Sequence, residues 1–477
     1  MIYWFAAPPL NQLFKPTRPS NAWLILLCSA GLLTIWPLPE TIALRQALLA
    51  VGCIASLFFL RAYAAVIFSR AAWPLWVFLG FYLWLLLHLL FFSTSYDEQL
   101  YELQHVWMRC LSTIPLGLSL GMLLAYPQPL DHPNAQPRAL ALPAGNTSVL
   151  LLLIGFSGIA LIGCGRYILE AWHTHQMINY EILYSFYKAK QPFVVGAALA
   201  LPLSFILIIR GINRQMSKWW IVASLLIIIF SLFVTYFSNT KNGIAVFTLS
   251  LAVFIFNLVL KLQRRLRSIL MAALVSMGIV SVSYVGIEMH LERNKAWGAL
   301  IANFKIGVDI DYQNYWRNGA AHPVPINQYG EPVDVSTYER TAWFRVGLRL
   351  LKENPMGYGL LHHSFGSLAL MKYPDFRKPI MSNRGATHSG WMDFALGFGF
   401  PGLLLLLVPL FAAWYRSLYQ EGLWFSYTSW TIPIMSFAYL TTEVAGMHYT
   451  EMLFFMVAFF CGITLQYPKQ HHQTHGK

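Results

Sequence analysis

Long apolar stretches, separated by short polar connections, recur along almost the whole chain. A helix of about 20 apolar residues crosses the hydrocarbon core of a bilayer. Only helices and closed barrels satisfy every backbone polar group in lipid, and continuous runs of this length are typical of helices. The pattern predicts an all-α polytopic membrane protein with about twelve transmembrane helices, near residues 22–38, 43–60, 73–94, 109–126, 148–165, 192–209, 219–237, 243–261, 268–287, 389–415, 424–442 and 449–466.

One polar segment between these runs is far longer than a simple turn. It divides the chain into residues 1–288 with predicted helices 1–9, a loop domain at 289–387, and residues 388–477 with predicted helices 10–12 and a tail. Connections of this length are usually functional when they are ordered. We therefore expect the loop domain, which we predict to be helical, to carry part of the site.

Basic residues concentrate in alternate loops, which sets the orientation. They follow the second, sixth and eighth runs, as Arg61 and Arg70, as Arg210, Arg214 and Lys218, and as Lys261, Arg264, Arg265 and Arg267. Loops rich in Lys and Arg stay on the cytoplasmic side. Both termini are therefore predicted to be cytoplasmic, and residues 289–387 lie outside.

The charge balance says more about what the protein does not bind than about what it binds. Only 11% of residues are charged, and the net charge is +13. The basic residues are divided between two membrane faces without a single stripe, which argues against nucleic acid. Those outside the cytoplasm are compatible with a solvated surface near anionic lipid or with an anionic substrate.

Cysteine and histidine spacing gives no sign of a metal or another cofactor. The five cysteines fall within or at the ends of the apolar runs, and no CxxC or Cys/His metal spacing occurs. Neither a disulfide framework nor a metal site is predicted. We expect chemistry that uses side chains alone.

The second half of the loop domain contains a predicted helix. Ser336-Thr-Tyr-Glu339 fits a capping box, and the helix should continue to Glu353 before Asn354-Pro355 ends it. Arg340 shares one face with Phe344, Gly347 and Leu351, and a cation among apolar neighbours needs an anionic partner. Arg340 is therefore a candidate for binding substrate.

The opposite face of this helix carries a second basic group. It consists of Arg345, Arg349 and Lys352. Such a cluster is typical of a solvated face, and its alternative role is substrate binding, for which we select Arg345.

The tenth apolar run begins with a histidine at the membrane boundary, His388. A helical projection places it on one face with Ala395, Gly399 and Gly402, where small residues allow close helix approach, and Pro401 should kink the helix. Imidazole suits proton transfer near neutral pH. His388 is thus either a general base held on a well-packed helix or an interfacial histidine.

Two further cations lie at the predicted outer boundary. Lys241 stands in the tight turn Ser238-Asn-Thr-Lys241-Asn-Gly243, and Arg166 opens a segment, 166–191, that is rich in Tyr and His. A lysine in such a turn either extends to the interface or binds a phosphate. The segment 166–191 is a candidate cover for the site.

Three stretches of this sequence resemble the O-antigen ligase family. His388-Ser389, nine residues and then Gly399-Phe-Pro-Gly402 is similar to the family signature. Arg340-x-x-Trp343 with Asn354-Pro355-x-Gly357-x-Gly359 resembles the stretch before that histidine, and the turn around Lys241 resembles a Ser-x-Ser-Arg-Gly motif. The layout of twelve spans with one large loop also agrees.

The resemblance implies a bacterial inner-membrane glycosyltransferase with a periplasmic active site and no cofactor. It would transfer a glycan from undecaprenyl pyrophosphate to a sugar hydroxyl of lipid A–core, with inversion, in lipopolysaccharide assembly. His388 would be the base, and Arg340 and Lys241 would stabilise the leaving pyrophosphate. The family usually has Arg at the position of Lys241. Either Lys241 acts on the phosphate as a point charge, or another cation, such as Arg166, supplies the planar two-pronged contact of a guanidinium.

Other functions fit parts of the same pattern. An O-antigen polymerase and a protein O-oligosaccharyltransferase would use similar donors with other acceptors. A transporter of a lipid-linked sugar would place its functional charges near the bilayer midplane, whereas the candidates here gather at the outer boundary.

Overall fold

The computed structural model describes residues 19–125, 145–175, 181–187, 189–261, 299–362, 364–376, 386–442 and 447–465, with isolated positions between 270 and 288. Over these residues the chain is helical, apart from loops and one bridge between Ile326 and Pro332. Its elements are α2 (Pro19–Ile35), α3 (Ile42–Ala62), α4 (Ala64–Ile67), η1 (Arg70–Ala72), α5 (Trp73–Phe91), α6 (Tyr96–Glu102), the π-helical turn η2 (Leu103–Trp107), α7 (Met108–Ala125), α8 (Gly145–Thr174), α9 (Glu181–Tyr187), α10 (Gln191–Ile212), α11 (Trp219–Phe237), α12 (Lys241–Lys261), α14 (Leu300–Val308), α15 (Val335–Glu353), α16 (Ser364–Lys372), α17 (Gly390–Leu418), α18 (Leu423–Thr441) and α19 (Met447–Thr464).

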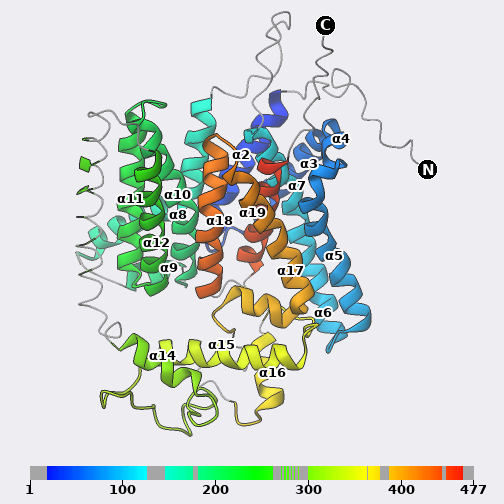
Figure 1. Cartoon of the computed structure of the whole chain (residues 1–477), viewed down its shortest axis with the longest axis vertical. Helices are drawn as coiled ribbons and strands as arrows, with labels where there is room; N and C mark the ends of the chain where they lie inside the picture. The colour runs from blue at the N-terminus through cyan, green and yellow to red at the C-terminus, as the bar shows by residue number, and fades with distance from the viewer. Residues whose placement is uncertain are drawn as a thin grey trace, which may run out of the picture.

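Among the described residues, eight helical stretches are long and apolar enough to cross a membrane, so the protein is a polytopic membrane protein. They are Ile42–Ala62, Arg70–Phe91, Tyr96–Ala125, Asn146–Thr174, Gln191–Ile212, Trp219–Phe237, Lys241–Leu258 and Gly390–Leu418. Helices α2, α18 and α19 pack among them in the same bundle (Figure 1). The all-α, multi-pass prediction is confirmed. The count of twelve stays a prediction, because the ninth run, 268–287, lies mostly outside the described residues.

Small residues allow helices α7 and α19 to pack closely against each other. A Cβ on Gly117 would lie 2.2 Å from the carbonyl oxygen of Phe455, and one on Gly121 would lie 2.1 Å from that of Phe459. In lipid, helices associate through such close packing rather than through the hydrophobic effect. This pair is buried at the centre of the molecule.

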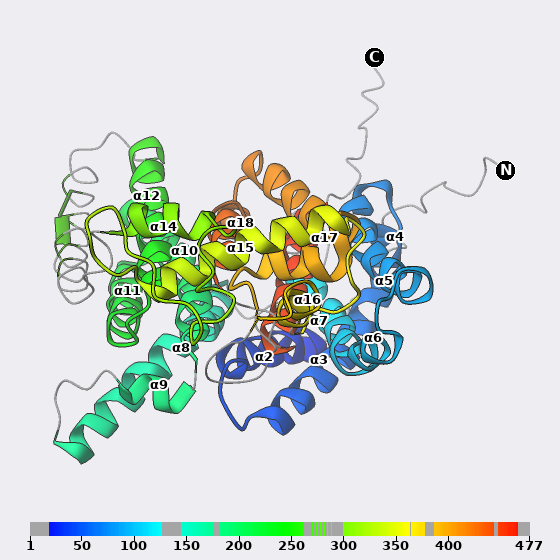
Figure 2. The same ribbon diagram turned by 90° about the horizontal axis from the view of Figure 1, so that it is seen from below.

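Helices α14, α15 and α16 form a layer across one end of the bundle, with α15 lying roughly perpendicular to the spans (Figures 1 and 2). Trp316, Tyr338, Trp343, Phe365 and Phe376 make its aromatic core. Met392, Ala395 and Leu396 of α17 belong to the same buried cluster. The layer is therefore packed onto the start of α17.

The first turn of α15 differs from the prediction. The N-cap is Asp334, whose carboxylate accepts a 3.0 Å hydrogen bond from the amide of Thr337, so Ser336 lies inside the helix. Asp is as good an N-cap as Ser, and its charge also interacts favourably with the helix N-terminus. The predicted capping box was wrong, whereas the predicted end at Glu353 is confirmed.

A junction of four glycines, Gly357, Gly359, Gly397 and Gly399, joins the end of α15 to the middle of α17. Helix α17 is interrupted at Gly399, where φ is +66°. The carbonyls of residues 396 and 397 accept from the amides of residues 358 and 359 at 2.9 and 2.6 Å, and the amide of residue 400 donates to the carbonyl of residue 355 at 2.9 Å. The predicted kink near Pro401 is confirmed. Backbone groups of the two segments replace the interrupted helical bonds.

The chain beyond this junction is tied to the α5–α6 end of the bundle. The carboxylate of Glu102 accepts hydrogen bonds of 2.9 and 2.7 Å from the amides of Leu361 and His362. The hydroxyl of Thr94 donates to the carbonyl of Tyr358 at 2.7 Å. The loop domain is thus fixed to the spans at its C-terminal end.

Candidate active site

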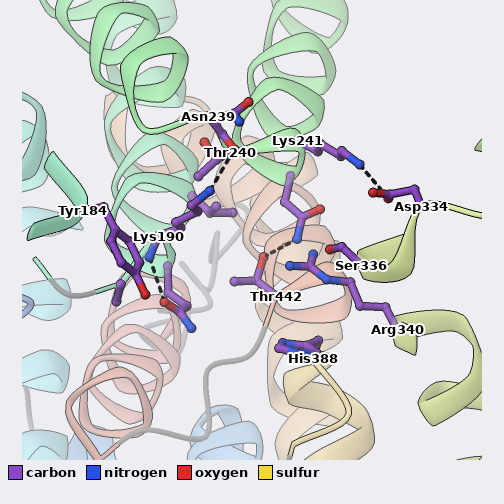
Figure 3. A pocket seen from close by; sticks show the side chains of 14 residues that line it. Tyr184, Lys190, Asn239, Thr240, Lys241, Asp334, Ser336, Arg340, His388 and Thr442 are labelled. Atoms are coloured by element: carbon purple, nitrogen blue, oxygen red, sulfur yellow. Dashed lines mark hydrogen bonds and ion pairs between the residues drawn. The ribbon is translucent and has the colours of Figure 1, made fainter. Parts of the chain in front are cut away.

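A cavity of about 450 Å³, the main cavity, lies between the end of the bundle and α15. Its wall comes from the start of α10, the α11–α12 turn, the first turns of α15, the start of α17 and the end of α18 (Figure 3). The lining residues are Tyr184, Ala189, Lys190, Gln191, Val194, Asn239, Thr240, Lys241, Asn242, Asp334, Ser336, Arg340, His388 and Thr442. The three predicted catalytic residues, His388, Arg340 and Lys241, therefore meet in one cavity although they lie in distant parts of the sequence.

His388 lies just before α17, not on it. Ser389 is the N-cap, and His388 has a φ of +58°, so the helical projection that includes it was wrong. Its neighbour Thr387 is held by Asp393, which accepts from the Thr387 amide at 3.0 Å and from its hydroxyl at 2.7 Å. A left-handed conformation at a non-glycine residue costs energy and persists where the surroundings enforce it.

The ring of His388 has a defined orientation as well. It stacks on the indole of Trp343, with ring centroids 5.4 Å apart and an interplanar angle of 14°. Trp343 is buried in the aromatic core of the loop domain. The imidazole is thus placed by two different elements, and its half-buried edge faces the main cavity.

Arg340 extends from α15 into the cavity, on the same side as His388 (Figure 3). Because the helix starts at Val335, Arg340 lies in its second turn, deeper than the capping-box prediction placed it. The side chain is half-buried. A guanidinium presents planar paired donors, which suit phosphate oxygens.

Lys241 is the first residue of α12 and is paired with the N-cap of α15. Its Nζ lies 2.8 Å from a carboxylate oxygen of Asp334 (Figure 3). Burial disfavours the charged carboxylate, but the hydrogen bonds from Lys241 and Thr337 outweigh it, so the pKa of Asp334 lies below its usual value. This ion pair joins the bundle to the loop domain beside the cavity.

Thr442 ties three spans together on the cavity wall. Its carbonyl accepts from the amide of Gly390 at 3.1 Å. The amide nitrogen of Asn242 donates to the carbonyl of Thr441 and lies 3.3 Å from the hydroxyl of Thr442. The ends of α12, α17 and α18 are therefore fixed relative to one another beside His388.

Lys190 and Asp334 line the cavity but were not singled out from the sequence. Lys190 lies directly before α10, and its Nζ is 3.4 Å from the carbonyl of Asn239. Lys190 could have been found from the sequence, because it is a basic residue at the outer end of a predicted span and lies inside the segment 166–191. For Asp334 the signal was its residue type, because Asp is also a good N-cap and lies two residues before Ser336, the predicted N-cap.

Two predicted binding residues lie away from the main cavity. Arg345 is exposed on α15. Arg166 lines a separate cavity, where it pairs with Glu170 at 3.2 Å and lies 5.3 Å from the ring centroid of Phe186. The main cavity thus draws its cations from Lys190, Lys241 and Arg340 instead.

Comparison with known proteins supports the resemblance seen in the sequence. Residues 226–407, which include Lys241, Arg340 and His388, match the family model described as O-Antigen ligase. No curated protein matches the chain. The resemblance is confirmed for this part of the chain, and it indicates a membrane enzyme of glycosyltransferase type that acts on lipid-linked glycans.

Proposed function

We propose that the protein is an O-antigen ligase. It transfers a glycan from undecaprenyl pyrophosphate to a sugar hydroxyl of lipid A–core, on the periplasmic face of a bacterial inner membrane. The observation that carries this proposal is the convergence of an oriented imidazole and several cations on one cavity at the membrane boundary.

The proposed reaction is a single displacement at the anomeric carbon. The acceptor oxygen forms a bond to that carbon while its proton passes to the imidazole of His388. The bond from the anomeric carbon to the phosphate oxygen breaks, and undecaprenyl pyrophosphate leaves. Attack from the side opposite the leaving group inverts the configuration.

Arg340 is the residue best placed to stabilise the leaving group. Negative charge grows on the pyrophosphate as the glycosidic bond breaks, and preorganised cations aimed at that charge lower the barrier. Lys190 adds a second cation from the opposite side of the cavity (Figure 3). Neither contribution requires a metal ion.

Lys241 has a double role in this proposal. Its pairing with Asp334 orients the first turn of α15, and Arg340 follows in the second turn, six residues after Asp334. It remains within the cavity, where it is available to the phosphates as a point charge. We expect Lys241→Arg to retain activity, and full activity in Lys241→Ala would remove this residue from the site.

Reconstitution tests the function directly. The purified protein in lipid nanodiscs receives lipid-linked glycan donor together with lipid A–core or with a protein acceptor. Glycosylated lipid A–core with an inverted linkage is the expected product. Longer lipid-linked chains alone would indicate a polymerase, a modified protein acceptor would indicate an oligosaccharyltransferase, and donor movement without transfer would indicate a transporter.

A further inference from the structure

Two more cavities lie beside one another next to the main cavity, at the same end of the bundle. The second cavity, of about 350 Å³, shares Ala189 and Gln191 with the main cavity. The third cavity, of about 300 Å³, shares Pro39 and Glu40 with the second. Because neighbouring cavities share wall residues, the three form a row that begins at His388 and ends at Arg166.

The charge along this row changes in a definite way. The main cavity contains Lys190, Lys241 and Arg340 against one carboxylate, Asp334. Across the second and third cavities together, the two cations Arg45 and Arg166 are matched by two carboxylates, Glu40 and Glu170. An excess of cations suits a pyrophosphate, whereas balanced charges suit a ligand that is neutral or weakly charged.

The second and third cavities are lined by types of side chain that can hydrogen-bond to sugar hydroxyls or pack against sugar rings. Glu40 and Gln191 offer acceptors and donors for hydroxyl groups. Tyr187 and Phe186 add aromatic surface to the same walls. A lipid tail would leave these polar groups without partners, which is costly in an apolar environment.

We infer that the second and third cavities form a binding groove for an oligosaccharide whose reacting end lies in the main cavity. This inference rests on the proposed function, since it assigns the bond that is made or broken to the cavity of His388. The same chemistry is offered by the glycan of the donor and by the sugar chain of the acceptor. Kinetics distinguishes these two sources.

Two substitutions block the groove at different distances from His388. Ala189→Trp fills the wall between the main and second cavities, and Ser185→Trp fills the third cavity from the exposed face of α9. Ala189→Ser and Ser185→Ala are the matched controls, because they keep the cavities open. Thermal unfolding of each variant shows whether the fold is retained.

The experiment measures transfer with lipid-linked donors fractionated by glycan length. If the groove holds the donor, Ser185→Trp raises KM about tenfold for long donors and leaves the shortest donor unchanged. Ala189→Trp then raises KM for shorter donors too. If the groove holds the acceptor, KM for lipid A–core rises and donor length has no effect. Unchanged KM for both substrates in folded variants overturns the inference.

A binding measurement separates this inference from the proposed function. Free oligosaccharide, released from the donor lipid by mild acid, is titrated against the protein in nanodiscs. Weaker binding by Ser185→Trp than by Ser185→Ala supports the groove even if the wild type transfers nothing to lipid A–core. Equal binding by these two variants contradicts the groove whatever reaction the enzyme catalyses.

Discussion

The two ends of α15 meet the bundle in opposite ways. At its N-terminal end, Asp334 and Arg340 border an open cavity, and Asp334 is held by an ion pair with Lys241 and a hydrogen bond from Thr337. At its C-terminal end, the glycine junction is closed, and backbone bonds to α17 leave no space for a side chain. The signature of His388, Gly399 and Gly402 spans both regions, yet only the histidine borders the cavity. One motif therefore combines a residue that lines the cavity with residues that only hold the helix in place.

The largest effect is expected from His388→Asn. Asn tolerates the left-handed backbone at this position but cannot act as a general base at neutral pH. Transfer should fall about 10²–10⁴-fold, while thermal stability and donor binding stay near those of the wild type. Full activity in this variant would remove His388 from the chemistry and leave the cavity without its base.

A substitution in the closed glycine junction should mainly lower the stability of the folded protein. In Gly399→Ala the new Cβ would lie 2.3 Å from backbone atoms of Pro355 and Met356, at a φ of +66°. Unfolding should become easier by about 2–4 kcal/mol, measured by thermal or denaturant unfolding in nanodiscs. Gly165→Ala on α8 is the control, because its Cβ meets nothing within 4 Å. Equal stability of the two variants would contradict the role of the junction.

Two substitutions of Arg340 distinguish the effect of its positive charge from the effect of its planar guanidinium group. Arg340→Gln should reduce kcat about 10²-fold, because one preorganised donor group is lost. Arg340→Lys keeps the charge without the planar fork and should recover part of that loss. Single-turnover transfer rates measure both variants. If Arg340→Lys and Arg340→Gln are equally impaired, charge alone does not explain the contribution of Arg340.

The smallest effect is expected at the Asp334–Lys241 pair. Asp334→Asn keeps an N-cap but removes the ion pair and should cost less than about 1 kcal/mol. Asp334→Ala loses the cap as well and should cost about 1 kcal/mol more. Unfolding of both variants at neutral pH measures the difference between them.

The same pair predicts a pH dependence. The pKa of Asp334 in the folded protein is below the usual value of 3.8. Its stabilising contribution is therefore complete above that value and is lost as the pH falls through the folded pKa. The stability difference between wild type and Asp334→Asn should shrink below pH 4. A difference that grows on acidification would contradict the ion pair.

Much of the architecture could be predicted from the chain because bilayer insertion depends on local composition. Continuous apolar runs predicted the all-α, multi-pass fold, and Asn354-Pro355 predicted the end of α15. The start of that helix was misplaced by two residues, because Asp334 and Ser336 are both good N-caps and a contact with distant Lys241 favours Asp334. Local sequence does not contain that contact.

From the amino-acid sequence alone, three residues could be selected that line one cavity in the folded protein: His388, Arg340 and Lys241. Three further facts required the folded structure: Lys241 is paired with Asp334, Lys190 lines the same cavity, and Arg166 lies two cavities away. The folded structure also decided the placement of the His388 ring, which depends on stacking against Trp343 from another helix. The physical reason is range: helix formation and membrane insertion depend on neighbouring residues, whereas a cavity depends on which helix ends pack together.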